Sequence, residues 1–345
     1  MITYWGVFMS ACGLALTRLR VSRLGWCLIG AGLVAFIGLR YQVGGDWGSY
    51  LGYLTRVSGA PFVRIFELKD PGYQLVNWVA AALGLEVWFV NVVAASVFVV
   101  GLIQFVRALP DPRIALAVSI PYMVTVMAMG YTRQAMAFGF VLWGLTFLMQ
   151  RRLVGFVVMI AIGATCHKSA VILVPLAVLA NTRNRGWSMV WVGTTGALLF
   201  VLLLQEHVDA LYQAYVVSEY ADAARGGPVR ALMNALPAAA FLVLRKRFDM
   251  SAEERALWFW VSLLCLLCVP LLAFSATAVD RVALYLMPIQ LVVASYFPEF
   301  FRRKDRVLAR VGVLGLYGAV MFVWLNYAGN RNGWLPYQFW PLVAG

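Results

Sequence analysis

Long apolar runs separated by short arginine-containing breaks dominate this chain and limit what it can fold into. Of its 345 residues, 63% are hydrophobic and only 12% are charged, and the mean hydropathy is +0.81. A soluble domain carries about a quarter charged residues, whereas a helix needs about 20 apolar residues to cross a bilayer. The sequence therefore predicts an all-α fold, a polytopic membrane helical bundle that forms a single integral-membrane domain over residues 1–345.

The apolar runs between charged breaks predict about twelve transmembrane helices. These runs are residues 2–16, 24–39, 88–106, 114–129, 134–149, 153–166, 169–180, 187–204, 230–244, 256–274, 282–297 and 307–326. Residues 73–85 are also apolar, but 13 residues are too few to cross a bilayer. We expect them to form a re-entrant or interfacial helix in an outer loop.

The basic residues predict how these helices are oriented. If residues 73–85 do not cross, six breaks on one side collect 18 of the 28 basic residues but, with Glu299 just before the last break, only 6 of the 15 acidic ones. Lys and Arg accumulate in cytoplasmic loops, so this side is predicted to be cytoplasmic and both termini to lie outside. The six breaks are at residues 18–23, 107–113, 151–152, 183–185, 245–255 and 302–310. The net charge of +13 therefore indicates no nucleic-acid partner.

The longest segments outside the predicted spans, residues 40–86, 205–228 and 327–345, fall on the predicted outer side, where loops on a rigid scaffold commonly carry function. The chain contains no Walker motif and no G-x-G-x-x-G, which argues against a nucleotide site. It contains no His, Cys and carboxylate spacing typical of a metal site, and we expect neither a metal nor a cofactor. Cys265 and Cys268 form a C-x-x-C inside an apolar run, which favours packing over redox chemistry.

Two polar motifs interrupt the outer side in the first half of the chain. Gly44 and Gly45 permit a tight turn whose amides can face an anion, and Asp46 can act as a general base. The alternative is a turn in which Asp46 caps a helix. Arg133 offers a planar fork for a phosphate and Gln134 an amide for a sugar hydroxyl, the alternative being an arginine that only snorkels to the interface.

Two further motifs follow in the second half. His167 can shuttle a proton or offset a pyrophosphate, and Lys168 adds positive charge; the alternative is a solvated turn. Asp280 and Arg281 are predicted to lie at the start of a helix on the outer side, with Tyr285 one turn further on, on the same face as Arg281. Here the alternative is an Asp-capped helix with a snorkelling arginine.

These motifs, in this order, resemble the EpsG family of polytopic membrane proteins, which are related in role to Wzy-type polysaccharide polymerases. The pieces that carry the resemblance are Val43 to Asp46 with Tyr50, Arg133-Gln134-Ala135, His167-Lys168-Ser169, Asp280-Arg281, and the tail Trp334-Leu335-Pro336-Tyr337. The resemblance implies the synthesis of exopolysaccharide, capsule or O-antigen in the bacterial inner membrane. The implied substrate is a glycan repeat unit linked to undecaprenyl diphosphate, and the implied active face is periplasmic.

On this interpretation the lipid diphosphate is already an activated leaving group, and the site needs cations, a base and an apolar groove. Arg133 and Arg281 are the candidates for the diphosphate, assisted by His167 or Lys168. Asp46 is the first candidate base, followed by His167 and then Asp280. The aromatic residues Tyr50, Tyr285, Trp334 and Tyr337 are candidates for stacking on sugar rings.

The expected reaction is a metal-independent displacement with inversion at the anomeric carbon. Expected partners are the lipid-linked glycan, membrane lipid, and chain-length regulator or export proteins. Three alternatives stay open: a flippase or transporter for the same lipid, a membrane acyltransferase that modifies the polysaccharide, and a lipid-using monosaccharide transferase.

Overall fold

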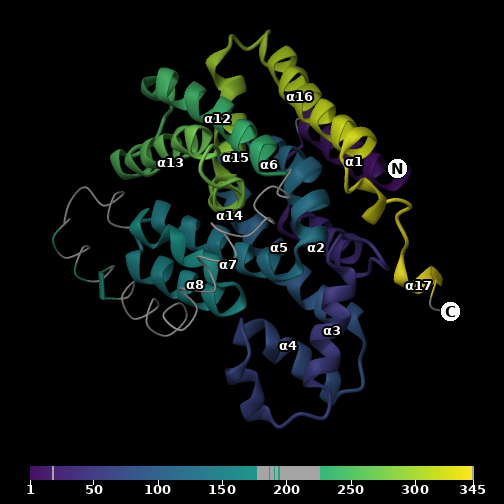
Figure 1. Ribbon diagram of the computed structural model, residues 1–345. Coiled ribbons are helices and arrows are strands. Elements are labelled where there is room, and N and C mark those ends of the chain that lie inside the picture. Colours follow the sequence, from purple (N-terminus) through teal and green to yellow (C-terminus); the bar gives the residue numbers. More distant parts are fainter. Residues whose placement is uncertain (18, 177–185, 187–189, 191–192, 195–225, 344–345) are drawn as a thin grey trace.

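The computed structural model of the chain is a bundle of helices (Figure 1). It describes residues 1–343 except residues 18, 177–185, 187–189, 191–192 and 195–225. The described residues contain no β-strand, so the predicted all-α fold is confirmed for them. The α-helices are α1 (Ile2–Leu16), α2 (Arg23–Gly38), α3 (Trp47–Val57), α4 (Pro71–Ala82), α5 (Val87–Arg107), α6 (Pro112–Ser119), α7 (Thr132–Met149), α8 (Leu153–Cys166), α12 (Gly226–Leu244), α13 (Ala252–Leu271), α14 (Ala276–Leu286), α15 (Pro288–Tyr296), α16 (Arg306–Tyr327) and α17 (Trp340–Val343).

Fewer helices than predicted have the length and hydropathy of a membrane span. Among the described residues four do, namely α5, α12, α13 and α16, and a fifth span results if α14 and α15 count together. The helices α1, α2 and α8, and α6 with the segment after it, are apolar but shorter. The apolar helices fit a membrane protein, but the predicted number of about twelve spans is not confirmed. The predicted run at residues 169–180 lies partly outside the described residues, and that at residues 187–204 lies largely outside them.

Proline explains why two predicted runs are not single α-helices. The run predicted at residues 282–297 breaks at Pro288, where α14 and α15 meet at an angle of 43°. Proline has no N–H to donate to the preceding turn, so the helix bends there. The run predicted at residues 114–129 begins as α6 and continues as the π-helix η2 (Ile120–Ala128), with Pro121 near its start. Segments of π-helix are rare in proteins, but those that occur are often at functional sites. This one ends a few residues before Arg133 and Gln134.

The helices α5 and α7 touch through Gly101 and Gly139. A Cβ on Gly101 would lie 1.9 Å from the carbonyl oxygen of Gly139, so an alanine fits only if the two helices separate. We expect Gly101→Ala to lower the free energy of unfolding by about 1–3 kcal/mol, the usual cost of overpacking. The melting temperature of the detergent-solubilised protein measures this. Gly32→Ala in α2 is the control, because a Cβ there meets nothing within 4 Å; an equal loss in both variants would contradict the prediction.

Basic turns gather at one end of the bundle, called here the basic end. Arg113 donates to the carbonyl oxygens of Thr17 at 2.6 Å and Leu19 at 2.9 Å, which joins the turn after α1 to the turn before α6. Arg310 pairs with Asp111 at 2.8 Å, which brings the start of α16 to the same place.

Further contacts add the remaining described turns to the basic end. Arg151, between α7 and α8, pairs with Glu253 near the start of α13 at 2.8 Å. The rings of Phe248 and Phe300 pack with centroids 4.9 Å apart, which joins the turn before α13 to the end of α15. Five of the six predicted cytoplasmic breaks therefore share one end, and the sixth, at residues 183–185, lies outside the described residues.

The opposite end carries a small lobe made of α3, the 3-10 helix η1 (Phe62–Glu67) and α4, seen at the bottom of Figure 1. The start of α4 touches the end of α8, where Gly72 lies against Thr165. The chain then enters α5 at this same end, because Asn91 of α5 accepts a hydrogen bond from Arg40 after α2. Both ends of α4 are thus on one side of the bundle, in agreement with the re-entrant or interfacial segment predicted at residues 73–85.

The segment after α16 returns to the loop that follows α2. Its main chain pairs with that loop through three hydrogen bonds, from the N–H of Tyr41 to Gln338, from Gly44 to Gly333 and from Trp340 to Leu39, with lengths of 2.9, 2.7 and 2.7 Å. Trp334 is 1% exposed and donates its indole N–H to the carbonyl oxygen of Thr125 at 2.8 Å. This C-terminal tail therefore fixes the loop that leads to Asp46.

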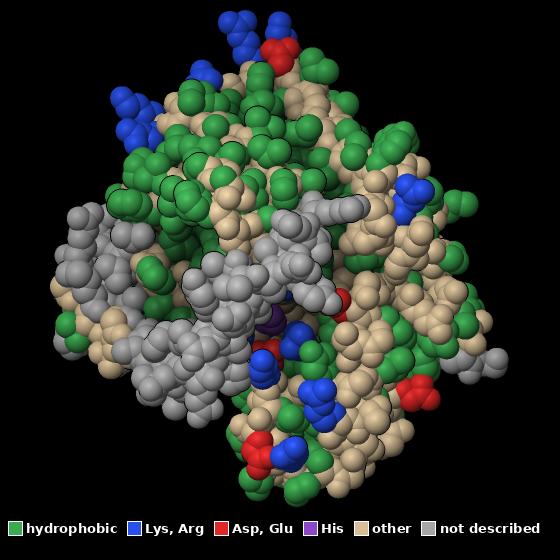
Figure 2. Space-filling view, in the orientation of Figure 1, with side chains coloured by type: hydrophobic (Ala, Val, Ile, Leu, Met, Phe, Trp, Pro, Cys, Tyr) green, Lys and Arg blue, Asp and Glu red, His purple; other side chains and the backbone are tan. Residues whose placement is uncertain are grey.

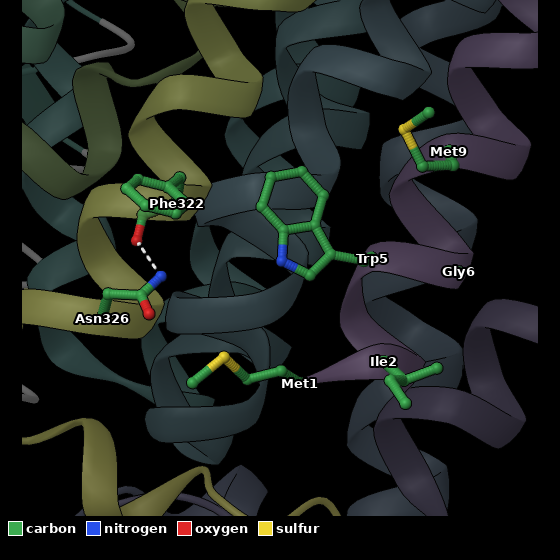
Figure 3. Close-up of a pocket in the computed structure, with 7 residues that line it drawn as sticks. All are labelled: Met1, Ile2, Trp5, Gly6, Met9, Phe322 and Asn326. Carbon is green, nitrogen blue, oxygen red and sulfur yellow. Dashed lines mark hydrogen bonds between the residues drawn. The ribbon is translucent and has the colours of Figure 1, made fainter.

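A cavity of about 580 Å³ opens between α1 and α16 (Figure 3). It is lined by Met1, Ile2, Trp5, Gly6, Met9, Phe322 and Asn326. The side chain of Asn326 donates to the carbonyl oxygen of Phe322 at 2.8 Å, and the other lining side chains are apolar. This lining offers no side chain for acid–base chemistry, so the candidate site lies elsewhere.

Candidate functional site

Polar side chains from both halves of the chain meet at the end of the bundle opposite the basic end. Figure 2 shows a histidine side chain in a hollow, with basic and acidic side chains around it. The members of this polar cluster are Asp46, Tyr50, Asp70, Arg133, Gln134, His167, Lys168 and Arg281. All four sequence motifs thus contribute to one place, although they are separated by as many as 235 positions in the sequence.

Arg133 is held on two sides at the start of α7. Its Nη1 pairs with the Asp70 carboxylate at 2.7 Å, and its guanidinium lies over the ring of Tyr53, 4.6 Å from the centroid. The side chain of Arg133 keeps 26% of its surface exposed, whereas that of Asp70 keeps 7%. The guanidinium is therefore oriented by the protein while part of its fork stays accessible to an anion.

Asp46 lies directly before α3, at the position of a helix cap, but its side chain makes no capping hydrogen bond. Burial raises the pKa of its carboxyl, while the charges of Arg133 and Arg281 and a hydrogen bond to Tyr50 partly offset the rise. The Tyr50 hydroxyl also accepts a hydrogen bond from the Thr132 N–H at 2.8 Å. Burial makes this carboxylate a stronger base than an exposed one, and the nearby cations only partly oppose the effect, so Asp46 is suited to accept a proton.

His167 ends α8 and begins the 3-10 helix η3 (Lys168–Leu173), where it is 9% exposed rather than solvated. Burial, together with the charges of Arg281, Arg133 and Lys168, lowers the pKa of its imidazole well below the ordinary value. Its Nδ1 accepts a hydrogen bond from the Ser169 N–H at 3.4 Å. A neutral imidazole carries one N–H, so the proton lies on Nε2.

Gln134 lies against this Nε2, with its amide nitrogen 3.4 Å away. Its side-chain oxygen has no hydrogen-bond partner among the described residues. The oxygen and nitrogen of an amide are interchangeable by rotation, and the rotated amide accepts the Nε2–H of His167. Its NH₂ group is then left to donate to a ligand, such as a sugar hydroxyl.

Arg281 and Asp280 come from α14. The charge of Arg281 acts on both Asp46 and His167, and its Nε is buried without a hydrogen-bond partner among the described residues. Asp280 instead pairs with Arg230 of α12 at 2.7 Å. The alternative considered for Asp280, that it caps a helix, is wrong, because the cap of α14 is Ser275, which accepts a hydrogen bond from the Ala278 N–H at 3.2 Å.

The pairing of Arg230 with Asp280 makes a stability prediction. The side chains of Arg230 and Asp280 are only 2% and 15% exposed, so removing Arg230 leaves a nearly buried carboxylate without its partner. We expect Arg230→Met to cost about 3–5 kcal/mol of unfolding free energy. Melting of the purified protein in detergent measures the loss, and the double variant Arg230→Met, Asp280→Leu should recover most of it. No recovery in the double variant would argue against the pair as the cause.

Arg40 is completely buried beside the polar cluster. It donates to the carbonyl oxygens of Ile37 and Val43 and to the side chains of Asn91 and Thr132, at 2.6 to 3.2 Å. No carboxylate of the described residues pairs with it, and burial lowers the pKa of its guanidinium to about 10. Arg40 therefore ties the loop after α2 to α5 and α7.

Several of the predicted site residues lie beneath the polar cluster rather than in it. The Gly44 amide is bound to Gly333, and a Cβ on Gly44, whose φ is +111°, would lie 2.4 Å from the carbonyl oxygen of Met129. Gly45 and Trp334 are in contact across the tail. Tyr337 donates its hydroxyl to Phe36, and Tyr285 is 2% exposed and packs against Phe138. Through these contacts the residues pack within the bundle and support the site without reaching into the polar cluster.

Sequence reasoning missed Asp70, Arg40 and Arg230. Asp70 stands in the polar stretch Glu67 to Pro71, where nothing distinguishes it from a solvated turn residue. Its backbone offers one signal in the structure, a φ of +60°, which is uncommon outside glycine. Arg40 and Arg230 each flank an apolar run, a position that also suits an arginine at the membrane interface.

The described residues contain no group of three or more His, Cys, Asp or Glu side chains that could hold a metal ion. Their cysteines, including Cys265 and Cys268, are free, and both members of the C-x-x-C are buried. His207 and most of the segment at residues 205–228 lie outside the described residues.

Comparison with known proteins gives one result. The sequence model of the EpsG family matches residues 23–339, which is nearly the whole chain. Comparison with curated proteins and with solved structures gives no match.

Proposed function

The chain belongs to the EpsG family, and on this premise we propose that it is a polysaccharide polymerase of the bacterial inner membrane. It joins oligosaccharide repeat units carried on undecaprenyl diphosphate, on the periplasmic side, to make exopolysaccharide, capsule or O-antigen. The observation that supports this most is that Asp46, Arg133, His167 and Arg281 come together in one polar cluster, where the charges of both arginines act on the Asp46 carboxyl and on His167. They lie at the end of the bundle opposite the basic turns, the end that the positive-inside rule assigns to the outside.

The two arginines would hold the diphosphate of the donor. Arg133 is oriented by Asp70 and Tyr53 and keeps part of its fork exposed. Arg281 has a buried Nε without a partner among the described residues. Two planar donors preorganised for negative charge stabilise the charge that develops as the diphosphate leaves. Lys168 adds positive charge beside them.

Asp46 would act as the general base. The acceptor hydroxyl loses its proton to the Asp46 carboxylate while its oxygen bonds to the anomeric carbon of the donor sugar. The bond from that carbon to the phosphate oxygen breaks, and undecaprenyl diphosphate leaves with the electron pair. One displacement inverts the anomeric configuration, and no step calls for a nucleotide or a metal.

The structure supports a change in the roles of the other two candidate bases. His167 has a lowered pKa and both ring nitrogens next to hydrogen-bond partners, so it would act with Gln134 in holding a sugar hydroxyl. Asp280 is engaged by Arg230, and it would set the rotation of α14 that presents Arg281. Within the part of the chain that the structure describes, Asp46 makes no such ion pair, which favours it over both.

The analysis of lipid-linked glycans in cells that lack this gene tests the proposal. A polymerase predicts single repeat units on the carrier at the periplasmic face of the inner membrane and a loss of long polymer, both reversed by the wild-type gene. Repeat units trapped on the cytoplasmic face would mean a flippase. Unchanged polymer length with a missing substituent would mean an acyltransferase, and either result would overturn the proposal.

A further inference from the structure

The lobe that carries Asp70 has an exposed apolar patch on η1 and α4. Phe62, Val63 and Phe66 are 47%, 66% and 65% exposed, and Leu75 is 40% exposed. The ring of Phe62 packs against those of Phe66 and Trp78, with centroids 5.6 and 5.3 Å apart. These five residues therefore form one surface, called here the lobe patch.

The lobe patch continues an exposed apolar stripe on α8. Val154, Val158 and Ile162 are exposed at intervals of four residues, so they share one face of this apolar helix. The stripe ends one turn before Thr165, which touches Gly72, and Gly72 lies one turn before Leu75 on α4. An apolar surface therefore runs from the side of the bundle onto the lobe.

Three exposed cations lie on the same lobe. Arg64 belongs to η1 beside the patch and pairs with Glu67, whereas Arg56 lies over the ring of Tyr53 and the charge of Lys69 acts on Lys168, both toward the polar cluster. Figure 2 shows basic and acidic side chains beside hydrophobic ones on this lobe. Aromatic and aliphatic side chains bordered by Lys and Arg are typical of segments that lie in the boundary between headgroups and acyl chains.

We propose that the lobe patch is inserted into the surface of the bilayer, with phospholipid as its partner. Phe62, Val63, Phe66 and Leu75 lie among the upper acyl chains, and Arg56, Arg64 and Lys69 lie among the phosphates of the headgroups. Lipid is favoured over a covering protein, because the patch is continuous with the exposed apolar stripe of α8 in a chain whose apolar helices fit a membrane protein.

The opposite side of the same lobe holds the polar cluster. Tyr53 lies over Arg133, Asp70 pairs with it, and Tyr50 bonds to Asp46. Insertion of the lobe patch therefore places Arg133 beside the layer in which lipid phosphates lie. This consequence, unlike the insertion itself, rests on the proposed function: a lipid-linked diphosphate reaches Arg133 along the bilayer surface without leaving it.

Spin labelling tests the insertion directly. The five native cysteines are replaced by alanine, a single cysteine is placed at Phe66 or at Val63, and the labelled protein is set in nanodiscs of mixed zwitterionic and anionic phospholipid. Collisions with oxygen, which dissolves in lipid, and with a water-soluble nickel complex are then compared. Glu86→Cys, at an exposed acidic position of the same end, is the control.

At positions 63 and 66 we expect the ratio of oxygen collisions to nickel collisions to be higher than at position 86. Greater access for nickel at both positions would place the patch in water and overturn the proposal. Low access for both reagents would place it under protein and overturn it as well. The use of two probe positions guards against a local effect of either substitution. The measurement needs no activity, so it separates failure of this inference from failure of the proposed function.

Discussion

Asp46→Asn is expected to abolish nearly all polymer formation while leaving the protein folded. The amide keeps the size of the carboxylate and can still contact Tyr50, but it cannot accept the proton of the acceptor hydroxyl. Loss of a general base typically costs about 100- to 10,000-fold in rate. The measurement is the rate of polymer formation by purified protein from lipid-linked repeat units, with Asp305→Asn at the start of α16, near the basic end, as the matched control.

The pH dependence of the same reaction gives an independent check. The base must be ionised, and burial raises the pKa of Asp46 above the ordinary 3.8, so activity is present above the raised pKa and is lost as the pH falls through it. The loss of activity on the acid side of the pH–rate profile should thus lie at higher pH than it would for an exposed aspartate. Because the pKa of His167 is well below the ordinary 6.5, this residue should cause no further change in activity near pH 6.5. A change in activity near pH 6.5 that disappears in His167→Gln would assign the base to His167 instead.

Arg133→Lys is expected to retain the protein in the membrane and to lose most activity. Lysine can still pair with Asp70 and lie over Tyr53, so the local structure keeps its charge balance. It cannot present a planar fork to a diphosphate, and loss of one preorganised donor costs about 100- to 1,000-fold. The same polymerisation assay measures the effect, normalised to the amount of protein in the membrane.

Two comparisons make the Arg133 result specific. Arg152→Lys, an exposed arginine at the basic end, should leave activity unchanged. Asp70→Asn removes the partner that orients Arg133, so it should reduce activity less than Arg133→Lys does and raise KM for the lipid-linked donor more than it lowers kcat. Full activity in Arg133→Lys would remove Arg133 from the site.

The helices were predictable because their ends coincide with charged breaks. The run predicted at residues 2–16 is α1, that at 153–166 is α8, and that at 88–106 differs from α5 by one residue at each end. The number of spans was not predictable from apolar runs alone. Proline breaks one run at Pro288, and the hydropathy of other runs does not extend over the length that a span needs.

The polar cluster was predictable in part for a simple physical reason. Charged residues are rare in this chain, so Asp46, Arg133, His167 and Arg281 stand out from their surroundings, and the topology places them at one end. The ion pairs that these residues make, however, join residues that are far apart in the sequence. Asp70 and Arg133 are 63 positions apart, and Arg230 and Asp280 are 50 apart. Neither pair leaves a local pattern, so neither could be found by reading along the chain.

The stacking roles predicted for aromatic residues show the same limit. Trp334 and Tyr337 stand in a polar tail, where a tryptophan and a tyrosine suit a sugar-binding surface. In the structure their polar atoms bond to the main chain of Thr125 and Phe36, inside the bundle. Side-chain composition indicated an aromatic surface, but only the path of the tail shows that it faces inward.

That path has a consequence for the order in which the protein becomes functional during its synthesis. The loop before Asp46 is fixed by main-chain bonds to residues Gly333, Gln338 and Trp340, which are translated almost 300 residues later. A nascent chain that has already inserted its first helices therefore holds Asp46 on an unanchored loop. On the proposed function, the site around Asp46 is therefore expected to form only after residues 333–340 have been synthesised and have docked against this loop.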